Sequence, residues 1–171
     1  MEGNALRVLG IDPGVATTGF GVVERAGGKM ASIDLGVIRT PAGTPHEIRL
    51  AILRAALAAL MRRHEPDVVA VERLFFNSNV KTAIAVGQAS GMALLAAAEA
   101  GLSVITYTPS EVKQSVVGVG SASKHQVQAM IAVLLGLDAP PSPPDAADAC
   151  ALAICHINRA GLSHAVERAL R

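Results

Sequence analysis

LRVLGIDPG, residues 6–14, is the stretch of this sequence that decides the fold. Residues 6–12 form a short apolar run typical of a buried strand, and the turn signal Asp12-Pro13-Gly14 ends that strand. Loops at the strand ends of an α/β sheet carry functional groups, so Asp12 is a candidate site residue. Taken alone, Asp12 is better explained as the Asx-turn residue of the Asp-Pro-Gly turn, which is a common motif.

The rest of the chain extends this strand into a mixed sheet. Strands are expected over 18–25 and 29–40, joined by the hairpin signal Gly27-Gly28. Three consecutive strands followed by alternating helices and strands indicate a mixed α/β sheet with helices packed on its faces. The apolar pattern predicts the later elements as a helix at 45–64, a strand at 67–72, a helix at 80–100, a strand at 103–107, and helices at 123–135 and 143–159.

Composition places the chain among globular proteins. With 171 residues, 51% apolar and 17% charged, it is able to bury a core and is not intrinsically disordered. The length predicts a single domain over residues 1–171, with a core at 6–160 and a tail at 161–171. The net charge of +1 leaves nucleic-acid binding open, because a carboxylate-rich site would mask a basic face elsewhere.

A mean hydropathy of +0.41 raises the question of a membrane. The charge-free stretch at 82–98 is too polar and too short, because a transmembrane helix needs about 20 mostly apolar residues. The N-terminus lacks the basic region and apolar stretch of a secretory signal, and Cys150 and Cys155 form neither a disulfide framework nor a metal knuckle. We therefore expect a soluble, cytoplasmic protein with no membrane contact.

Three further carboxylates stand in unusual places. Glu72 directly follows the apolar run VVAV, where an unpaired charge is costly, so it needs a cation or a basic partner. In SPPDAAD, 142–148, we expect Ser142 as the helix N-cap and a proline as the first helical residue, which would explain Asp145 as a capping residue. Asp148 lies past the capping positions and on the same face as Asp145, where like charges repel unless a cation lies between them.

These carboxylates, together with Asp12, form a set of hard oxygen ligands. Such a set suits Mg²⁺ or Mn²⁺, whereas zinc prefers nitrogen and sulfur. Mg²⁺ held by a few carboxylates generally takes phosphate oxygens among its remaining ligands. Two such ions about 4 Å apart would activate a water on one side of a phosphodiester and stabilise the leaving oxygen on the other. The pattern therefore favours metal-assisted phosphodiester hydrolysis.

Five stretches in register resemble the RuvC family of bacterial Holliday-junction resolvases, and hence the RNase H-like nuclease superfamily. The resemblance covers the chain from near its N-terminus to His156. It implies an RNase H-like α/β fold, with a mixed five-stranded sheet of three antiparallel strands plus two parallel strands, flanked by helices. The matching stretches are GIDPG at 10–14 with TGFG at 18–21, VERLFFNSN at 71–79, VGQASG at 86–91, VKQSVVGVGSASK at 112–124 and DAADACALAICH at 145–156.

The resemblance implies a structure-specific DNA endonuclease that resolves four-way (Holliday) junctions by symmetric paired nicks, in homologous recombination and DNA repair. By the resemblance, the catalytic and metal-binding residues are Asp12, Glu72, Asp145 and Asp148, for two Mg²⁺ ions per active site with Mn²⁺ able to substitute. Asp12 would bridge both ions, and Glu72 and Asp148 would bind one each. Asp145 would complete the site or help to position the water. Hydrolysis would leave 5′-phosphate and 3′-hydroxyl ends.

The resemblance also implies partners. A homodimer would match the two-fold symmetry of a four-way junction and present two active sites to it. We expect the helix at 80–100, which is apolar nearly all round, at the dimer interface, although its Gly87-x-x-x-Gly91 spacing suits close packing within one chain equally well. The family further suggests the branch-migration proteins RuvA and RuvB as partners.

Six residues are expected at the DNA interface. By the resemblance, Phe75 stacks on bases or separates them as a wedge. Lys113 and Lys124 flank the flexible loop at 118–121. Because the matching stretch includes both, the resemblance implies that they bind phosphates, with Lys113 closer to the scissile group. The further candidates are Arg73, Asn79 and Lys81.

Three alternative functions share parts of this sequence pattern. An ATP-binding domain of the actin and sugar-kinase type also opens with a Gly-Ile-Asp-Gly-like strand, but it needs a second homologous domain for which 171 residues leave no room. A non-catalytic junction-binding module would be expected to lose one or more of the carboxylates. A nuclease acting on RNA–DNA hybrids shares the carboxylates, and only the stretches at 71–91 and 112–124 distinguish a resolvase from it.

Overall fold

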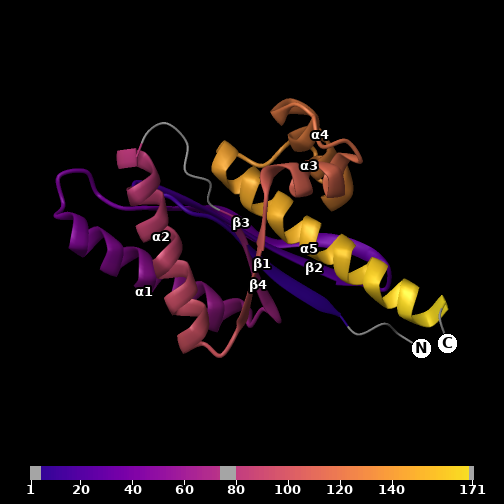
Figure 1. Cartoon of the computed structure of the whole chain (residues 1–171), viewed down its shortest axis with the longest axis horizontal. Helices are drawn as coiled ribbons and strands as arrows, with labels where there is room; N and C mark the ends of the chain where they lie inside the picture. The colour runs from indigo at the N-terminus through magenta and orange to yellow at the C-terminus, as the bar shows by residue number, and fades with distance from the viewer. Residues whose placement is uncertain (1–4, 74–79, 170–171) are drawn as a thin grey trace.

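The structure is a computed structural model that describes residues 5–73 and 80–169 (Figure 1). The described chain folds into a single sheet with helices on both faces. Its elements in chain order are β1 (Leu6–Asp12), β2 (Thr17–Ala26), β3 (Lys29–Arg39), α1 (His46–His64), β4 (Val68–Glu72), α2 (Val80–Glu99), β5 (Ser103–Tyr107), α3 (Pro109–Val117), α4 (Lys124–Leu135) and α5 (Pro144–Ala169).

The sheet has the predicted mixed topology. Its five strands lie in the order β3-β2-β1-β4-β5. The pairs β1–β2 and β2–β3 are antiparallel, whereas β4 runs parallel to β1 and β5 runs parallel to β4. The predicted hairpin turn is confirmed, because Gly27 and Gly28 both have positive φ angles, 56° and 82°, that a glycine adopts without strain.

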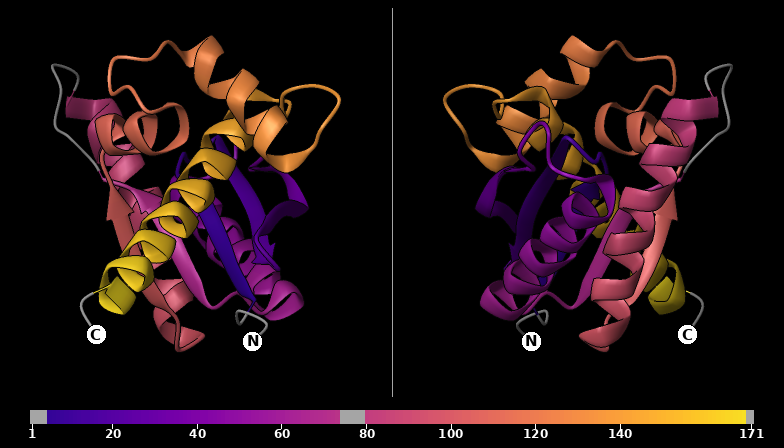
Figure 2. Two further views of the ribbon diagram at one scale, coloured as in Figure 1. Left: turned by 90° about the vertical axis from the view of Figure 1, so that its right-hand side faces the viewer. Right: turned by 90° about the vertical axis from the view of Figure 1, so that its left-hand side faces the viewer.

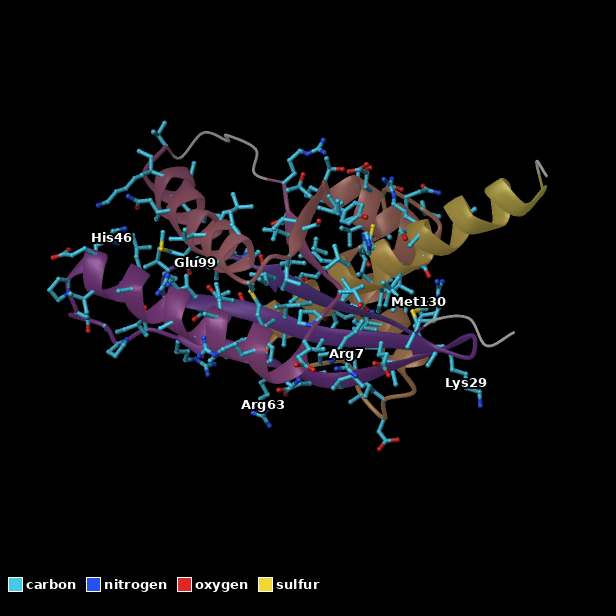
Figure 3. All side chains as sticks on the ribbon, turned by 90° about the horizontal axis from the view of Figure 1, so that it is seen from below. Arg7, Lys29, His46, Arg63, Glu99 and Met130 are labelled. Atoms are coloured by element: carbon cyan, nitrogen blue, oxygen red, sulfur yellow. The ribbon has the colours of Figure 1, made fainter. Side chains whose placement is uncertain are left out.

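Apolar side chains on the two faces of the sheet build two halves of the core. Along β1, Val8 points toward the layer formed by α3, α4 and α5, whereas Leu9 and Ile11 point toward α1 and α2. Figure 2 shows α5 lying across one face of the sheet and α1 with α2 across the other. Charged side chains such as Lys29 and Arg63 are exposed and project from the outer surface (Figure 3).

Three glycines let α5 lie unusually close to the sheet. A Cβ at Gly10 would overlap the carbonyl group of Ala149, and a Cβ at Gly19 would overlap the carbonyl group of Asp145. A Cβ at Gly21 would lie only 2.6 Å from the Sγ atom of Cys150. We call Gly10, Gly19 and Gly21 the glycine patch. It fixes how closely the first turns of α5 approach β1 and β2.

The helix α3 is absent from the sequence-based prediction, which has no helix between 103–107 and 123–135. In the structure the Thr108 hydroxyl accepts a hydrogen bond from the backbone N–H of Glu111, whose carboxylate accepts one from the backbone N–H of Thr108. This capping box starts a helix that is too short to show an apolar period. The signal that would have found it is the run TPSE, with a proline at the first helical position.

The start of α5 also differs from the prediction. The sequence predicts Ser142 as the N-cap, but the helix begins at Pro144, so Ser142 lies outside it and Asp145 lies in its first turn. The physical reason is that a residue before a proline avoids the helical conformation, and Pro143 precedes Pro144. The far end differs as well, because α5 continues to Ala169 instead of ending near residue 159.

Candidate active site

Two strand ends bring the first two carboxylates together. Because β1 and β4 are parallel neighbours with Ile11 paired to Val71, the residues that follow, Asp12 and Glu72, lie side by side at the same edge of the sheet. Both side chains are half-buried. The predicted proximity of these two strand-end carboxylates is therefore a direct result of parallel pairing.

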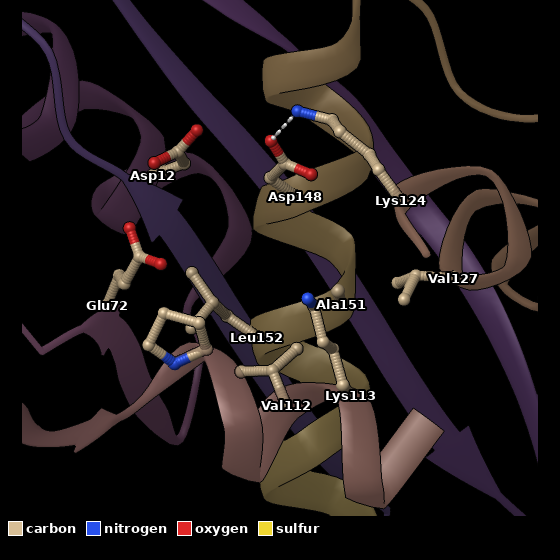
Figure 4. A pocket seen from close by; sticks show the side chains of 10 residues that line it. Asp12, Glu72, Val112, Lys113, Lys124, Val127, Asp148, Ala151 and Leu152 are labelled. Atoms are coloured by element: carbon tan, nitrogen blue, oxygen red, sulfur yellow. Dashed lines mark hydrogen bonds and ion pairs between the residues drawn. The ribbon is translucent and has the colours of Figure 1, made fainter. Parts of the chain in front are cut away.

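The helix α5 supplies the other two carboxylates. Asp148 faces Asp12 and Glu72 across a pocket of about 230 Å³ (Figure 4). Asp145, one turn earlier, is close enough to raise the pKa of Asp12 but does not line the pocket. The residues that line the pocket are Asp12, Glu72, Pro109, Val112, Lys113, Lys124, Val127, Asp148, Ala151 and Leu152.

Burial and mutual repulsion raise the pKa values of two of these carboxylates, Asp12 and Glu72. Burial, followed by the charges of Glu72, Asp148 and Asp145, raises the pKa of Asp12 to about 7. Burial and the charge of Asp148 likewise raise the pKa of Glu72. The carboxylates thus repel one another at neutral pH, and a divalent cation between them would relieve that repulsion.

The donor set fits a magnesium or manganese ion. All four candidate ligands offer carboxylate oxygens, which these cations prefer. Within the described ranges, no three acidic, histidine or cysteine side chains converge closely enough to enclose a metal ion on their own. This agrees with the usual Mg²⁺ site, in which one or two carboxylates share the ion with water and substrate phosphate oxygens. Water and substrate phosphate oxygens would therefore have to supply the remaining ligands of an ion held here.

Two lysines reach the same pocket. The Nζ atom of Lys124 lies 2.8 Å from Oδ2 of Asp148, and this hydrogen-bonded ion pair raises the pKa of Lys124 (Figure 4). Lys113 lines the pocket from α3. The structure thus brings both predicted lysines to the carboxylates, although they come from separate helices.

Comparison with known protein families shows to which family this chain belongs. The family model described as "Crossover junction endodeoxyribonuclease RuvC" matches residues 8–156. The chain belongs to the RuvC family. A crossover junction endodeoxyribonuclease RuvC from Chloroflexus aggregans is 55% identical over 151 residues, which are 88% of this chain and 92% of that relative. One from Pelotomaculum thermopropionicum is 50% identical over 149 residues, 87% of this chain and 91% of the relative.

Solved structures confirm the fold of the RuvC family for this chain. A structure described as Thermus thermophilus RuvC in complex with Holliday junction substrate matches with a TM-score of 0.88 and 38% identity, covering 92% of this chain and 96% of that chain. The yeast mitochondrial Holliday junction resolvase, at 18% identity and a TM-score of 0.66 over 93% of this chain and 82% of its own, shares the fold alone. The predicted RNase H-like architecture and family are confirmed.

Of the remaining DNA-interface candidates, the two that the structure describes, Arg73 and Lys81, do not line the pocket. Arg73 is exposed just after β4, where its Nε lies 3.4 Å from Oγ1 of Thr106. Lys81 is exposed in the first turn of α2. Phe75 and Asn79 lie outside the described residues. Their DNA contacts stay predictions that rest on the RuvC resemblance.

Most of the apolar pocket residues are a part of this RuvC-family site that the sequence did not indicate. Pro109 and Val112 come from the unpredicted helix α3, and Val127 comes from α4. Ala151 and Leu152 lie one turn beyond Asp148 on α5. They make the floor beside the carboxylates apolar, which raises the cost of unpaired negative charge there.

Proposed function

We propose that this chain is a metal-dependent, structure-specific endonuclease that resolves four-way DNA junctions in homologous recombination and DNA repair. Membership of the RuvC family supports the reaction, and the Thermus relative solved with a Holliday junction supports the substrate. The observation that carries the proposal is the convergence of Asp12, Glu72 and Asp148 on one pocket beside two lysines.

The four carboxylates would share the work of holding two Mg²⁺ ions, for which Mn²⁺ would substitute. Asp12, whose pKa is raised by the charges of Glu72 and both α5 carboxylates, would hold both ions, while Glu72 and Asp148 would hold one each. Asp145 would complete the site or orient the attacking water. When bound, the two ions would supply an activated water and charge stabilisation at the leaving oxygen. In-line attack would leave 5′-phosphate and 3′-hydroxyl ends.

Basic residues around the pocket would hold the DNA backbone. Lys113 and Lys124 would contact phosphates on either side of the scissile bond, with Lys113 nearer to it, since both line the pocket that holds the carboxylates. Phe75 would stack on bases or separate them at the branch point. Arg73, Asn79 and Lys81 would extend the contact along a DNA arm.

The helix α2 would form the interface of a homodimer. Val80, Ile84 and Leu95 are 65%, 54% and 44% exposed, and their spacing places them on one face of the helix with Gly91. The opposite face carries Ala89, Ala93 and similar residues into the core. A second copy of the chain would cover the exposed apolar stripe and give the two-fold symmetry that paired nicking of a junction requires.

The stretch at 82–98 is by itself too short for a membrane span, but it lies within the 20-residue helix α2, which length and composition alone would let cross a membrane. We favour the dimer for two reasons. One side of the helix packs against α1 and the sheet. On its exposed side, Gln88 and Gly91 interrupt the apolar residues that a membrane span would need. We therefore propose a cytoplasmic enzyme without membrane contact. The branch-migration proteins RuvA and RuvB are the partners that the family suggests.

Strand cleavage of an end-labelled junction with a mobile core tests the proposal directly. A linear duplex and an RNA–DNA hybrid serve as comparison substrates, each with and without Mg²⁺. Paired nicks at symmetric positions, in the junction only and with metal only, are the expected result. Cleavage of the hybrid in preference to the junction would overturn the substrate but keep the metal site. Tight junction binding without cleavage in Mg²⁺ or Mn²⁺ would make the chain a binding module.

A further inference from the structure

The helix α3 is the shortest of the three helices that line the pocket. It contributes Pro109, Val112 and Lys113 to the lining, yet it is only 9 residues long and buries only Val112 and Val116. Helices shorter than about 12 residues are marginal on their own, so tertiary contacts must hold this one in place. By contrast, α5 is buried at nearly every position between Ala146 and Ile157, where it packs against the sheet. The position of Lys113 therefore depends on what holds α3.

A polar cluster behind the pocket makes these contacts. One guanidinium nitrogen of Arg159 on α5 lies 3.1 Å from Oε1 of Glu111, and its Cζ lies 5.3 Å from the ring centroid of Tyr107. The hydroxyl of Tyr107 lies 2.7 Å from Nδ1 of His156, one turn before Arg159. We call Tyr107, Glu111, His156 and Arg159 the α3 clasp. None of its members lines the pocket.

The α3 clasp connects the elements that carry the active site. Tyr107 ends β5 and pairs in register with Glu72, and its carbonyl oxygen accepts a hydrogen bond of 2.7 Å from the backbone N–H of Arg73. Glu111 uses its second carboxylate oxygen to cap α3, accepting the backbone N–H of Thr108 at 2.8 Å. The cluster thus fixes the first turn of α3 against both α5 and the strand that ends beside Glu72.

Side-chain direction separates the clasp from the pocket. Residues two apart on a helix do not face each other, so Glu111 reaches Arg159 while Lys113 reaches the pocket. A second contact holds the next turn of α3, because Nδ2 of Asn158 donates to the carbonyl oxygen of Ser115 at 3.0 Å. The Arg159–Glu111 pair is partly exposed, with 47% and 32% of the side chains accessible, so its stabilisation of the whole fold is small. Its effect is expected on placement.

We propose that the α3 clasp holds Lys113 over the carboxylate pocket, which makes its four members positioning residues for DNA cleavage. The inference rests on the proposed role of Lys113 at the scissile phosphate. If Lys113 is misplaced, the charge that it supplies near the reacting phosphate is lost, whereas most of the junction surface is still bound. The cleavage step should therefore suffer more than junction affinity.

The test uses Arg159→Met and the milder Tyr107→Phe, which keeps the aromatic ring under Arg159 and removes only the hydroxyl. Arg25→Met is the matched control, since Arg25 also reaches α5, through the carbonyl oxygen of Ile157, but from β2. Single-turnover cleavage should slow about tenfold in Arg159→Met and about threefold in Tyr107→Phe, with junction affinity in Ca²⁺ within twofold of wild type. Amide hydrogen exchange should speed up in α3 in both variants and stay unchanged there in Arg25→Met.

A double-mutant cycle with Lys113→Met shows whether the clasp acts through that lysine. If it does, adding Arg159→Met or Tyr107→Phe to Lys113→Met causes no further loss of rate. Two results would overturn the clasp proposal and leave the proposed role of Lys113 intact. One is a further loss of cleavage rate equal to the loss seen in the wild-type background. The other is a wild-type cleavage rate for both single clasp variants when Lys113→Met is slow. A wild-type rate for Lys113→Met would instead refute the proposed role of Lys113, and the clasp proposal with it. If Arg159→Met does not fold, the Tyr107→Phe cycle decides.

Discussion

At the scale of single residues, the strongest electrostatic effect falls on Asp12. Its carboxylate ends a buried strand and faces Glu72 and Asp148, so ionisation costs free energy in the folded chain. An unfolded chain imposes no such cost, because there the carboxyl group has the ordinary aspartate pKa of 3.8. Grouping the carboxylates therefore lowers the free energy of unfolding of the metal-free protein, as expected where carboxylates are gathered to bind a cation.

Asp12→Asn should stabilise the metal-free protein at pH 8. The folded-state pKa of Asp12, about 7, lies above the unfolded value of 3.8, so wild-type stability falls as pH rises between these values. The asparagine variant avoids this loss, and a gain of about 2 kcal/mol would raise Tm by roughly 4–8 °C. Thermal unfolding in EDTA at pH 8 and pH 4 measures it. An equal gain at both pH values would contradict the electrostatic explanation.

Metal affinity should fall in acid for the same reason. A proton and a metal ion compete for Asp12, so binding weakens as pH drops below about 7. Between pH 8 and pH 6 we expect roughly a tenfold loss of affinity if one proton is displaced. Calorimetric titration with Mn²⁺ or Ca²⁺ at constant ionic strength measures the affinity. Equal affinities at the two pH values would show that Asp12 is not a ligand.

Asp148→Asn should separate binding from catalysis. The substitution keeps the shape of the side chain but removes one carboxylate charge from the pocket and weakens the pair with Lys124. Junction cleavage should drop by at least about 100-fold, while junction affinity in Ca²⁺ or EDTA stays within a few-fold of wild type. Cleavage of labelled junctions and fluorescence anisotropy give the two numbers. An equal loss of binding and cleavage would mean that Asp148 is structural.

At the scale of elements, the glycine patch controls where α5 lies. A methyl group at Gly10 would displace the carbonyl of Ala149, the residue next to Asp148, so Gly10→Ala should lower both stability and metal affinity. We expect a loss of about 2 kcal/mol, or roughly 4–8 °C in Tm. Gly36→Ala is the control, since its methyl group would meet only the edge of the Phe20 ring, at 3.2 Å. Equal losses in the two variants would show that the close approach of α5 is unimportant.

Some of the helices and strands that form the site could be predicted from the sequence, and others could not. The strands ending at Asp12 and Glu72 could be predicted because each is an apolar run that stops at a carboxylate. Parallel pairing then placed both residues at one edge. The helix α3 could not be found from apolar period, because it spans only 9 residues and packs through Val112 and Val116. The proximity of Lys113 to the carboxylates, and its support by Arg159, is a tertiary arrangement that no local pattern encodes.

At the scale of the whole molecule, the pocket and the exposed apolar stripe lie on opposite faces of the sheet. The face covered by α3, α4 and α5 carries the pocket, and the face covered by α1 and α2 carries the exposed apolar stripe. Because the pocket and the stripe lie on different layers, a second copy on α2 would leave the carboxylates of both subunits open to DNA. Dimerisation and chemistry are therefore expected to be separable by mutation.

The double variant Ile84→Glu with Leu95→Glu should be a monomer that keeps its active site. Two charges buried in an apolar interface are strongly unfavourable, while at these positions, 54% and 44% exposed, they cost the isolated fold little. Val133→Glu is the matched control, because Val133 is 74% exposed on α4, away from the stripe. Analytical ultracentrifugation should show a dimer for wild type and control and a monomer for the double variant.

Plasmid cleavage then tests whether the dimer is needed for paired nicks. On a plasmid carrying a cruciform junction, the dimer should give linear product from two nicks in one encounter. The monomer should give mainly nicked circles, and its metal affinity should equal that of wild type. A wild-type monomer that still makes paired nicks would place the two-fold symmetry in the junction and not in the protein.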